Sequence, residues 1–328
     1  MSASASPVPT PFLRRWWRRL YWLRRDWANL KRLDWWGPSV FAGFGGIGDE
    51  LLATCFIREL CSRIGHPVTT LARYPELFLR NPDVGRLLPA NPAIIATATT
   101  WGTDLRRPQE WQSDITDDRQ SPPQRHILAE AALAGGLHGH IQLRPWLHLS
   151  AEELAAGRIA NGPQIAIHST GGAARYFFLN KVWGVANFKQ VVDALAGRFQ
   201  IIQLGSASDA LLRGTIDRRG ACTLRGSAAV LAASEFFIGQ VGLLMHLARS
   251  VETRAVIVFG GREFPDQSGY PCNENLFSKP PCAPCWRKSK CDYGHVCMTQ
   301  ITPADVLAAV ERLHPRVGQP LETDTVDL

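Results

Sequence analysis

The stretch Gly43-Phe44-Gly45-Gly46-Ile47-Gly48-Asp49-Glu50-Leu51-Leu52-Ala53-Thr54 decides the fold. It follows a short apolar run at 39–42, so a strand, a glycine-rich turn and a helix succeed one another. The glycines at 43, 45 and 48 match the dinucleotide fingerprint G-x-G-x-x-G, which places a pyrophosphate on the helix N-terminus. Asp49 does not fit that interpretation, because a carboxylate in the first helical turn would repel an anionic cofactor. It is better suited to accept a proton from a neutral substrate.

The second predicted strand, at 67–72, tests the dinucleotide interpretation. In a dinucleotide site, an acidic residue at the end of this strand binds a ribose hydroxyl. Here Arg73 follows the strand instead. Since an arginine suits a 2'-phosphate, an NADP-dependent oxidoreductase using the Gly43 to Gly48 turn remains an alternative. Glu50 points about 100° away from Asp49 around the helix, so we expect a solvated or capping group there.

Four segments, in order along the chain, carry a resemblance to a known family. They are Gly48 to Thr54, which is similar to a G-D-x-L-x-x-T motif; Ile165 to Gly172; Asn180-Lys181-Val182-Trp183; and Phe237 to Ala248, with its Gly-Leu-x-Met-His pattern around Gly242 to His246. Together they resemble glycosyltransferase family 9, the heptosyltransferase family of lipopolysaccharide synthesis. The chain departs from the family at Val241, where an acidic residue often stands.

The resemblance implies the GT-B architecture, two Rossmann-like domains with parallel sheets facing a central cleft. It implies an inverting glycosyltransferase that moves a heptose-like sugar from a nucleotide-diphosphate donor, ADP-heptose-like, to a lipopolysaccharide-core or other glycan or glycolipid acceptor. Asp49 is then the general base. The expected donor-binding residues are Ser169, Thr170, Gly171, Lys181, Gly205, Asp209, Gly242, Leu244, Met245 and His246, and the acceptor-side turn holds Gly46 and Gly48. A catalytically inactive GT-B scaffold is a further alternative, motivated by Val241.

Catalysis should need no metal cofactor. Lys181 and the N-terminus of the helix that begins near Gly242 can stabilise the departing diphosphate, and the sequence has no Asp-x-Asp pair to hold a divalent ion beside it.

Length and composition predict two domains. A chain of 328 residues with 45% hydrophobic content can bury two cores, at 38–150 and 151–328. Expected strands lie near 39–43, 67–72, 164–168, 199–204, 235–239 and 255–259, and expected helices near 49–64, 124–136, 187–197, 208–213, 227–233, 243–250 and 303–313, with a loop at 100–124. The sequence has no apolar run of eighteen residues and no signal peptide, so we expect a cytoplasmic protein.

Residues 1–37 are predicted to hold a disordered tail and a basic, tryptophan-rich amphipathic helix. Residues 1–36 contain eight basic and two acidic side chains, so six of the seven excess positive charges lie there. Tryptophans and arginines on such a helix suit an anionic membrane surface, which residues 12–36 would bind at the cytoplasmic face of the inner membrane. Docking on the body or on a second subunit is the alternative. Nucleic acid is not an expected partner, because the remaining body is almost neutral.

Cys282, Cys285, Cys291 and Cys297 form a C-x2-C-x5-C-x5-C pattern within the cysteine-rich loop 272–297. Thiols so closely spaced favour a structural zinc or iron ion. The loop resembles the cysteine finger of the autotransporter heptosyltransferases, which hold iron. Cys272 and His295 are possible substitute ligands, and four reduced cysteines in a substrate-side loop are the alternative.

Overall fold

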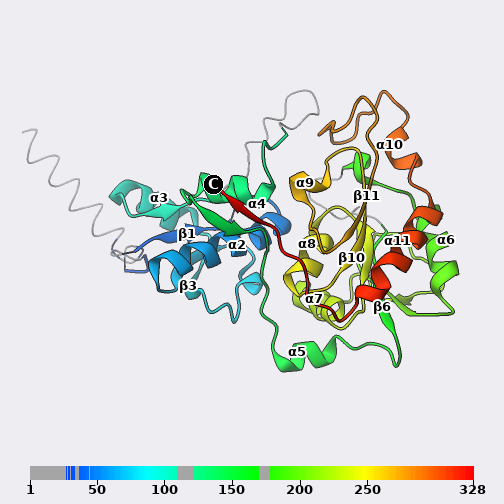
Figure 1. Ribbon diagram of the computed structural model, residues 1–328. Helices are drawn as coiled ribbons and strands as arrows, with labels where there is room; N and C mark the ends of the chain where they lie inside the picture. The colour runs from blue at the N-terminus through cyan, green and yellow to red at the C-terminus, as the bar shows by residue number, and fades with distance from the viewer. Residues whose placement is uncertain are drawn as a thin grey trace, which may run out of the picture.

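The computed structural model describes residues 27, 29, 31–33, 37–43, 45–108, 122–169 and 178–328. In this part of the chain, two parallel sheets with helices packed on them lie next to each other (Figure 1). We call them the N-terminal and the C-terminal sheet. The alternation of strands and helices expected from the sequence is confirmed.

The N-terminal sheet has four parallel strands in the order β3-β2-β1-β4. They are β1 (Ser39–Phe41), β2 (Val68–Ala72), β3 (Val84–Pro89) and β4 (Leu105–Arg106), and their helices are α2 (Ile47–Ile64), α3 (Pro92–Trp101) and α4 (Ile127–Ala134). Successive side chains of a strand point to opposite faces. Val40 therefore packs in the cluster that contains Phe56 of α2, whereas Phe41 packs with Ile94 of α3.

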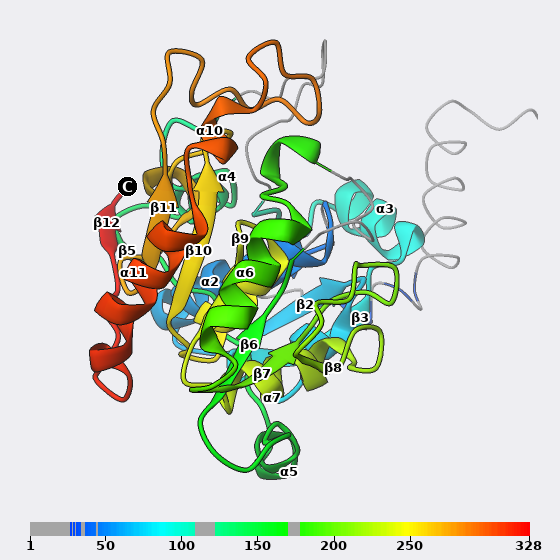
Figure 2. The same ribbon diagram turned by 90° about the vertical axis from the view of Figure 1, so that its right-hand side faces the viewer.

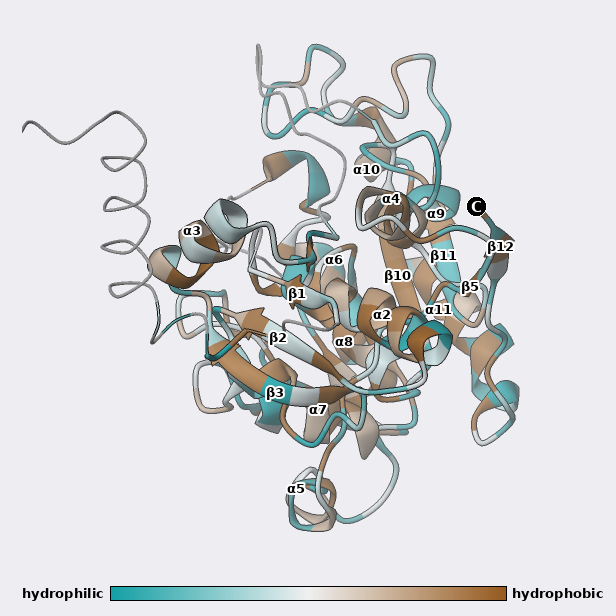
Figure 3. Cartoon of the chain, turned by 90° about the vertical axis from the view of Figure 1, so that its left-hand side faces the viewer, coloured by the Kyte–Doolittle hydropathy of each residue, from teal (hydrophilic) through white to brown (hydrophobic). Residues whose placement is uncertain are grey.

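The C-terminal sheet has six parallel strands in the order β11-β10-β9-β6-β7-β8. They are β6 (Gln164–Ile167), β7 (Gln200–Gln203), β8 (Ile216–Asp217), β9 (Phe237–Gln240), β10 (Ala255–Gly260) and β11 (Glu274–Phe277), and the helices are α6 (Val185–Leu195), α7 (Leu224–Ala232), α8 (Leu243–Ser250), α9 (Pro265–Ser268), α10 (Val296–Thr299) and α11 (Pro303–Leu313). Every residue of β10 is buried, and Figure 3 shows this strand as a hydrophobic band.

The two faces of the C-terminal sheet bury different side chains. Ile165 and Ile167 pack under α6 and α11, which lie next to each other on one face (Figure 2). Ala166 points to the opposite face, into a cluster that includes Met245 of α8 and Phe56 of α2. That cluster contains side chains from both halves of the chain, so α2 and α8 are held against each other by buried apolar contact.

Two crossings between the halves lie within the described residues. α5 (Ala151–Ala156) lies on the first crossing, and its Glu153 carboxylate accepts hydrogen bonds from Arg225 of α7 at 2.6 Å. At the C-terminus the chain returns to the N-terminal half, where β12 (Thr325–Asp327) pairs antiparallel with β5 (His140–Gln142) (Figure 1). Short 3-10 turns are η1 (Pro75–Leu77), η2 (Leu179–Lys181) and η3 (His314–Arg316).

Two sequence-based expectations are wrong. The helix expected at 208–213 is a turn, because the Gln203 side chain bonds the backbone of Ala210 and Leu212 at 2.8 Å each and thereby replaces helical hydrogen bonds. The loop expected at 100–124 begins inside α3 and contains β4, a two-residue strand too short to leave a periodic pattern. Residues 109–121 of it lie outside the described residues.

Most of the predicted N-terminal amphipathic helix lies outside the described residues. Its described end packs on the N-terminal half: Leu33 is buried beside Phe41, and the carbonyl of Arg32 accepts a hydrogen bond from Arg86 at 2.9 Å. Trp27 is half exposed. Within the described ranges, the helices are too short or too polar to cross a bilayer.

Candidate active site

The glycine-rich turn before α2 fixes the Asp49 carboxylate. Asp49 folds back over the turn and accepts a hydrogen bond from the Gly46 backbone N–H. Gly45 has φ +66°, and a Cβ at this position would overlap the Asp49 carboxylate. The turn therefore requires glycine both for its backbone conformation and for the close approach of the side chain.

Glu50 is not the solvated or capping group expected from the sequence. Its side chain is fully buried and accepts hydrogen bonds from the backbone N–H groups of Arg73 at 3.1 Å and Tyr74 at 2.9 Å. Arg73 also donates through Nε to Glu50 and through Nη2 to the Gly45 carbonyl at 2.5 Å. Arg73 thus ties the β2 end to the turn, which argues against a role as ligand of an NADP 2'-phosphate.

A charge cluster lies on the C-terminal half, around Glu263. The Lys181 ammonium lies 2.5 Å from Oε1 of Glu263, and Arg262 donates to the same oxygen at 2.8 Å. Burial alone would raise the pKa of Glu263, but Lys181 and Arg262 bring it down to about 2. Burial lowers the pKa of Lys181, whereas Glu263 and Asp49 act in the opposite direction. The charge of Asp49, on the other half of the chain, therefore contributes to the electrostatic environment of Lys181.

The N-terminus of α8 lies beside the glycine-rich turn. A Cβ on Gly48 would be 3.9 Å from the Leu243 Cα, so the first turns of α2 and α8 meet. Gly242 precedes α8 with φ +155°. The free N–H groups of this helix start can face an anion. Leu244 is half-buried against the core, and Met245 is fully buried in it, so the Met245 side chain is structural.

His246 belongs to a buried polar link between the two halves. Its Nδ1 lies 2.7 Å from the Tyr270 hydroxyl, and the Tyr270 ring lies beside the ring of His126. His126, before α4, accepts a hydrogen bond from the Leu128 N–H through Nδ1, so its Nε2 carries the proton and donates it to the Gly269 carbonyl at 3.0 Å. Burial lowers the pKa of His126 to about 4 and that of His246 to about 3. Both rings are neutral at pH 7.

The remaining predicted donor residues follow the ends of β6 and β7 in the chain. Ser169 is fully buried at the end of β6, and within the described part of the chain its hydroxyl has no hydrogen-bond partner. Thr170 and Gly171 lie outside the described residues. Asp209 accepts a hydrogen bond from the Ser206 N–H at 2.7 Å and lies 3.5 Å from Nε2 of His168. Gly205 has φ +133°, and a Cβ there would lie 2.5 Å from the Asp209 carboxylate.

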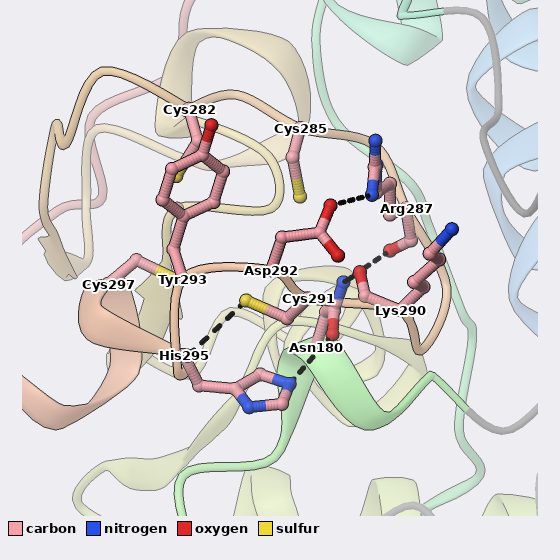
Figure 4. Close-up of a pocket in the computed structure, with 11 residues that line it drawn as sticks. Asn180, Cys282, Cys285, Arg287, Lys290, Cys291, Asp292, Tyr293, His295 and Cys297 are labelled. Atoms are coloured by element: carbon pink, nitrogen blue, oxygen red, sulfur yellow. Dashed lines mark hydrogen bonds and ion pairs between the residues drawn. The ribbon is translucent and has the colours of Figure 1, made fainter.

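The four cysteines of the C-x2-C-x5-C-x5-C pattern line one cavity of about 200 Å³, together with His295 and Asn180 (Figure 4). The backbone N–H of His295 donates to the Cys291 sulfur at 3.3 Å, and the His295 ring bonds the Asn180 side chain at 2.9 Å. Cys272 is buried elsewhere, in the cluster of α2 and α8. His295 therefore remains a possible substitute ligand, whereas Cys272 does not.

The donor set of this cavity suits a metal ion, since thiolate sulfur is a preferred ligand of zinc and iron. The cysteine side chains lie further apart than the ligands of a bound ion do. Within the described ranges, no three Cys, His, Asp or Glu side chains come close enough together to hold an ion. Closure of the loop around an ion would have to bring the four sulfurs together.

Sequence reasoning missed Glu263, Arg262, Tyr270, His126 and His168. Each contacts a predicted site residue or its neighbours only through the tertiary fold. One signal was present: Gly260 ends a buried apolar strand and Gly261 follows it, and such a turn at the carboxyl end of a parallel strand marks a ligand-facing edge.

Comparisons with known proteins support the fold. No protein-family model and no curated protein sequence matches the chain. Among solved structures, the chain is similar to the iron-containing dodecameric glycosyltransferase TibC from enterotoxigenic E. coli H10407, with 18% identity, a TM-score of 0.67, and coverage of 86% of this chain and 77% of TibC. A second TibC structure holds ADP-D-β-D-heptose.

Two further structures extend the likeness. E. coli ADP-heptose lipopolysaccharide heptosyltransferase II is 15% identical, with a TM-score of 0.63 over 85% of this chain and 99% of its own. A glycosyltransferase family 9 protein from Veillonella parvula DSM 2008 is 15% identical, with a TM-score of 0.63 over 87% of this chain and 99% of its own. The chain has the GT-B fold of these proteins, so the fold implied by the sequence motifs is confirmed.

Proposed function

We propose that this protein is an inverting glycosyltransferase that transfers a heptose-like sugar from an ADP-heptose-like donor to a glycan or glycolipid acceptor, such as a lipopolysaccharide core. The observation that carries the proposal is the contact between the first turns of α2 and α8, which places the Asp49 turn of one half beside the α8 N-terminus of the other. The fold shared with proteins that act on or bind ADP-heptose supports it. No specific observation favours the NADP-dependent oxidoreductase or the inactive scaffold.

Asp49 is the proposed general base. It would accept the proton of the attacking acceptor hydroxyl while the oxygen forms its bond to the anomeric carbon. The hydrogen bond from the Gly46 N–H holds the carboxylate in one orientation. Attack on the face opposite the leaving diphosphate inverts the configuration at that carbon.

The departing diphosphate would be stabilised from the C-terminal half. Lys181 supplies a positive charge, and the N-terminus of α8 supplies backbone N–H groups. The Ser169 hydroxyl, buried at the end of β6 without a partner among the described residues, would donate to a phosphate or sugar oxygen once it becomes accessible to the donor. Gly205 and Asp209 would contact the nucleoside.

A thermal-shift panel tests the donor assignment. ADP-heptose and ADP should raise the melting temperature of the full chain, because a ligand that binds only the folded state stabilises it. UDP- and GDP-sugars serve as matched controls and should shift it less. A shift with NADPH alone would instead favour the oxidoreductase.

We further propose that Cys282, Cys285, Cys291 and Cys297 hold one structural zinc or iron ion. Elemental analysis should find one metal per chain, and Cys285→Ser should lose it, because a tetrahedral site needs all four ligands. Cys222→Ser, outside the cavity, is the control. Equal metal content in both variants would refute the assignment.

Residues 12–36 are proposed to hold the protein at an anionic membrane surface in the cytoplasm. The full chain should pellet with phosphatidylglycerol vesicles, and a chain lacking residues 1–37 should not. Equal pelleting of the two would contradict the proposal.

A further inference from the structure

Glu263 is a buried carboxylate outside all the sequence motifs of this chain. Its residue is 4% exposed, on the loop between β10 and α9. Its Oε1 lies 2.5 Å from Nζ of Lys181 and accepts a hydrogen bond from Nη1 of Arg262 at 2.8 Å. Its Oε2 accepts a hydrogen bond from the Ser268 hydroxyl at 2.8 Å. Both oxygens are therefore held, Oε1 by Lys181 and Arg262 and Oε2 by Ser268 of α9, and the carboxylate cannot turn away from the lysine without losing these bonds.

Lys181 itself sits where an ammonium group is difficult to keep charged. Its side chain is only 20% exposed, and burial lowers its pKa; the Phe178 ring, 5.4 Å from Nζ, is a weaker contact that favours the cation. The charged or titratable groups that act on it are Arg262 and Glu263 on the β10–α9 loop, Asp49 on α2 and His246 on α8. Since His246 is neutral, Glu263 and Asp49 supply the negative charge that offsets burial and Arg262.

The rest of this loop is also anchored. The Arg262 guanidinium donates through Nε to the Arg287 carbonyl at 3.0 Å and lies over the ring of Trp286, which is 1% exposed. The Asn180 side chain, next to Lys181, donates to the carbonyls of Arg287 and Lys290. The same segment thus holds both partners of the ion pair, which sets the position of Glu263 relative to Lys181.

We propose that Glu263 is a positioning residue: it directs one N–H of Lys181 into the protein, leaves the other two for the donor diphosphate, and keeps the ammonium charged. The reference to the diphosphate rests on the proposed function. The Val241–Gly242 turn, at the start of α8, has no acidic side chain that could serve instead.

Neutralising Glu263 should change the charge state of Lys181. Burial and Arg262 both lower the pKa of Lys181, whereas Glu263 raises it. Removal of the carboxylate charge therefore lowers the pKa of Lys181 further. An opposite charge at this distance moves a pKa by about one unit or more. Without it, Lys181 should therefore lose its proton at a pH lower by at least that amount.

The test measures Lys181 directly in the full chain without ligand. Acetic anhydride labels only the neutral amine, so the pH dependence of Lys181 acetylation, followed by mass spectrometry, reports its ionisation. In Glu263→Gln the midpoint should fall by about one pH unit or more. Lys189, on the surface of α6, is the internal reference and should label equally in all proteins.

Two further variants keep the test decisive. Ser268→Ala removes one hydrogen bond to Glu263 without changing charge and should leave the Lys181 midpoint in place. Glu263→Asp retains the charge one methylene further away and should shift the midpoint downward by less; it decides the question if Glu263→Gln does not fold. Unchanged midpoints in the Glu263 variants, or an equal shift in Ser268→Ala, would overturn the inference.

Calorimetric titration with ADP separates this inference from the proposed function. Wild type should bind ADP, and Glu263→Gln should bind it several-fold more weakly. As the pH is raised, the variant should lose its affinity at a lower pH than wild type does. A wild type that does not bind ADP would contradict the proposed function, while the labelling result would still decide the role of Glu263.

Discussion

Replacing His126 by asparagine should remove a source of acid sensitivity from the contact between the two halves. His126 is neutral in the fold, where burial lowers its pKa to about 4. In the unfolded chain its pKa returns to about 6.5. Between these two pKa values the unfolded state binds a proton at His126 and the folded state does not. The stability that depends on neutral His126 is complete above pH 6.5 and is lost as the pH falls toward 4.

The magnitude follows from the difference between the two pKa values. At pH 5 the unfolded state gains about 2 kcal/mol from protonation of this one ring, and the full difference of about 3 kcal/mol is reached below pH 4. Asparagine retains the hydrogen bond to the Leu128 N–H, because it is a favourable N-cap, but it does not titrate. Its loss of the bond to the Gly269 carbonyl is a pH-independent cost of about 1 kcal/mol.

Urea unfolding of wild type and His126→Asn between pH 5 and 7 measures this. His246 is present in both proteins, so its titration cancels in the comparison. The stability difference between the two proteins should change by about 2 kcal/mol over this range, with wild type losing more. A difference that stays constant from pH 7 to pH 5 would refute the assignment of a neutral, buried His126.

Three further substitutions probe the turn and the core. Glu50→Ala should destabilise the fold by about 3 kcal/mol or more, because Arg73 and Tyr74 lose the acceptor of their backbone N–H groups; thermal melting measures this, and a loss below about 1 kcal/mol would contradict it. Gly45→Ala should cost about 1–2 kcal/mol through its positive φ and should reduce transfer activity strongly, because the new Cβ displaces the Asp49 carboxylate; wild-type activity would show that the turn tolerates a side chain. Phe56→Ala should cost about 3–5 kcal/mol in urea unfolding, since Phe56 is 1% exposed, whereas exposed Leu79→Ala should stay within about 0.5 kcal/mol.

The sequence was sufficient to predict what depends on local pattern. Buried strands such as β10 leave apolar runs, and helices such as α2 leave a periodic pattern after a glycine turn. β3 was not predicted because its side chains are only half-buried or exposed, and it holds Gly85, Arg86 and Pro89. An edge strand of this kind has no continuous apolar run.

Side-chain partners were harder to predict than elements. The expected solvated position of Glu50 was wrong because the orientation of α2 against the end of β2 depends on packing, which a helical wheel does not contain. Glu263 and Lys181 are 82 positions apart in the sequence and meet only because their loops lie at the same edge of the C-terminal sheet. The roles of Asp49 and Lys181 came from family-like motifs; their mutual placement required the fold.

The most direct test of the proposed mechanism separates binding from chemistry at Asp49. ADP-heptose affinity is measured by calorimetry and single-turnover sugar transfer by product analysis, in wild type and Asp49→Asn. The account predicts a donor affinity within about two-fold of wild type and a transfer rate lower by about a hundred-fold or more, because only the general base is lost. Transfer at the wild-type rate by Asp49→Asn, with donor binding intact, would contradict it.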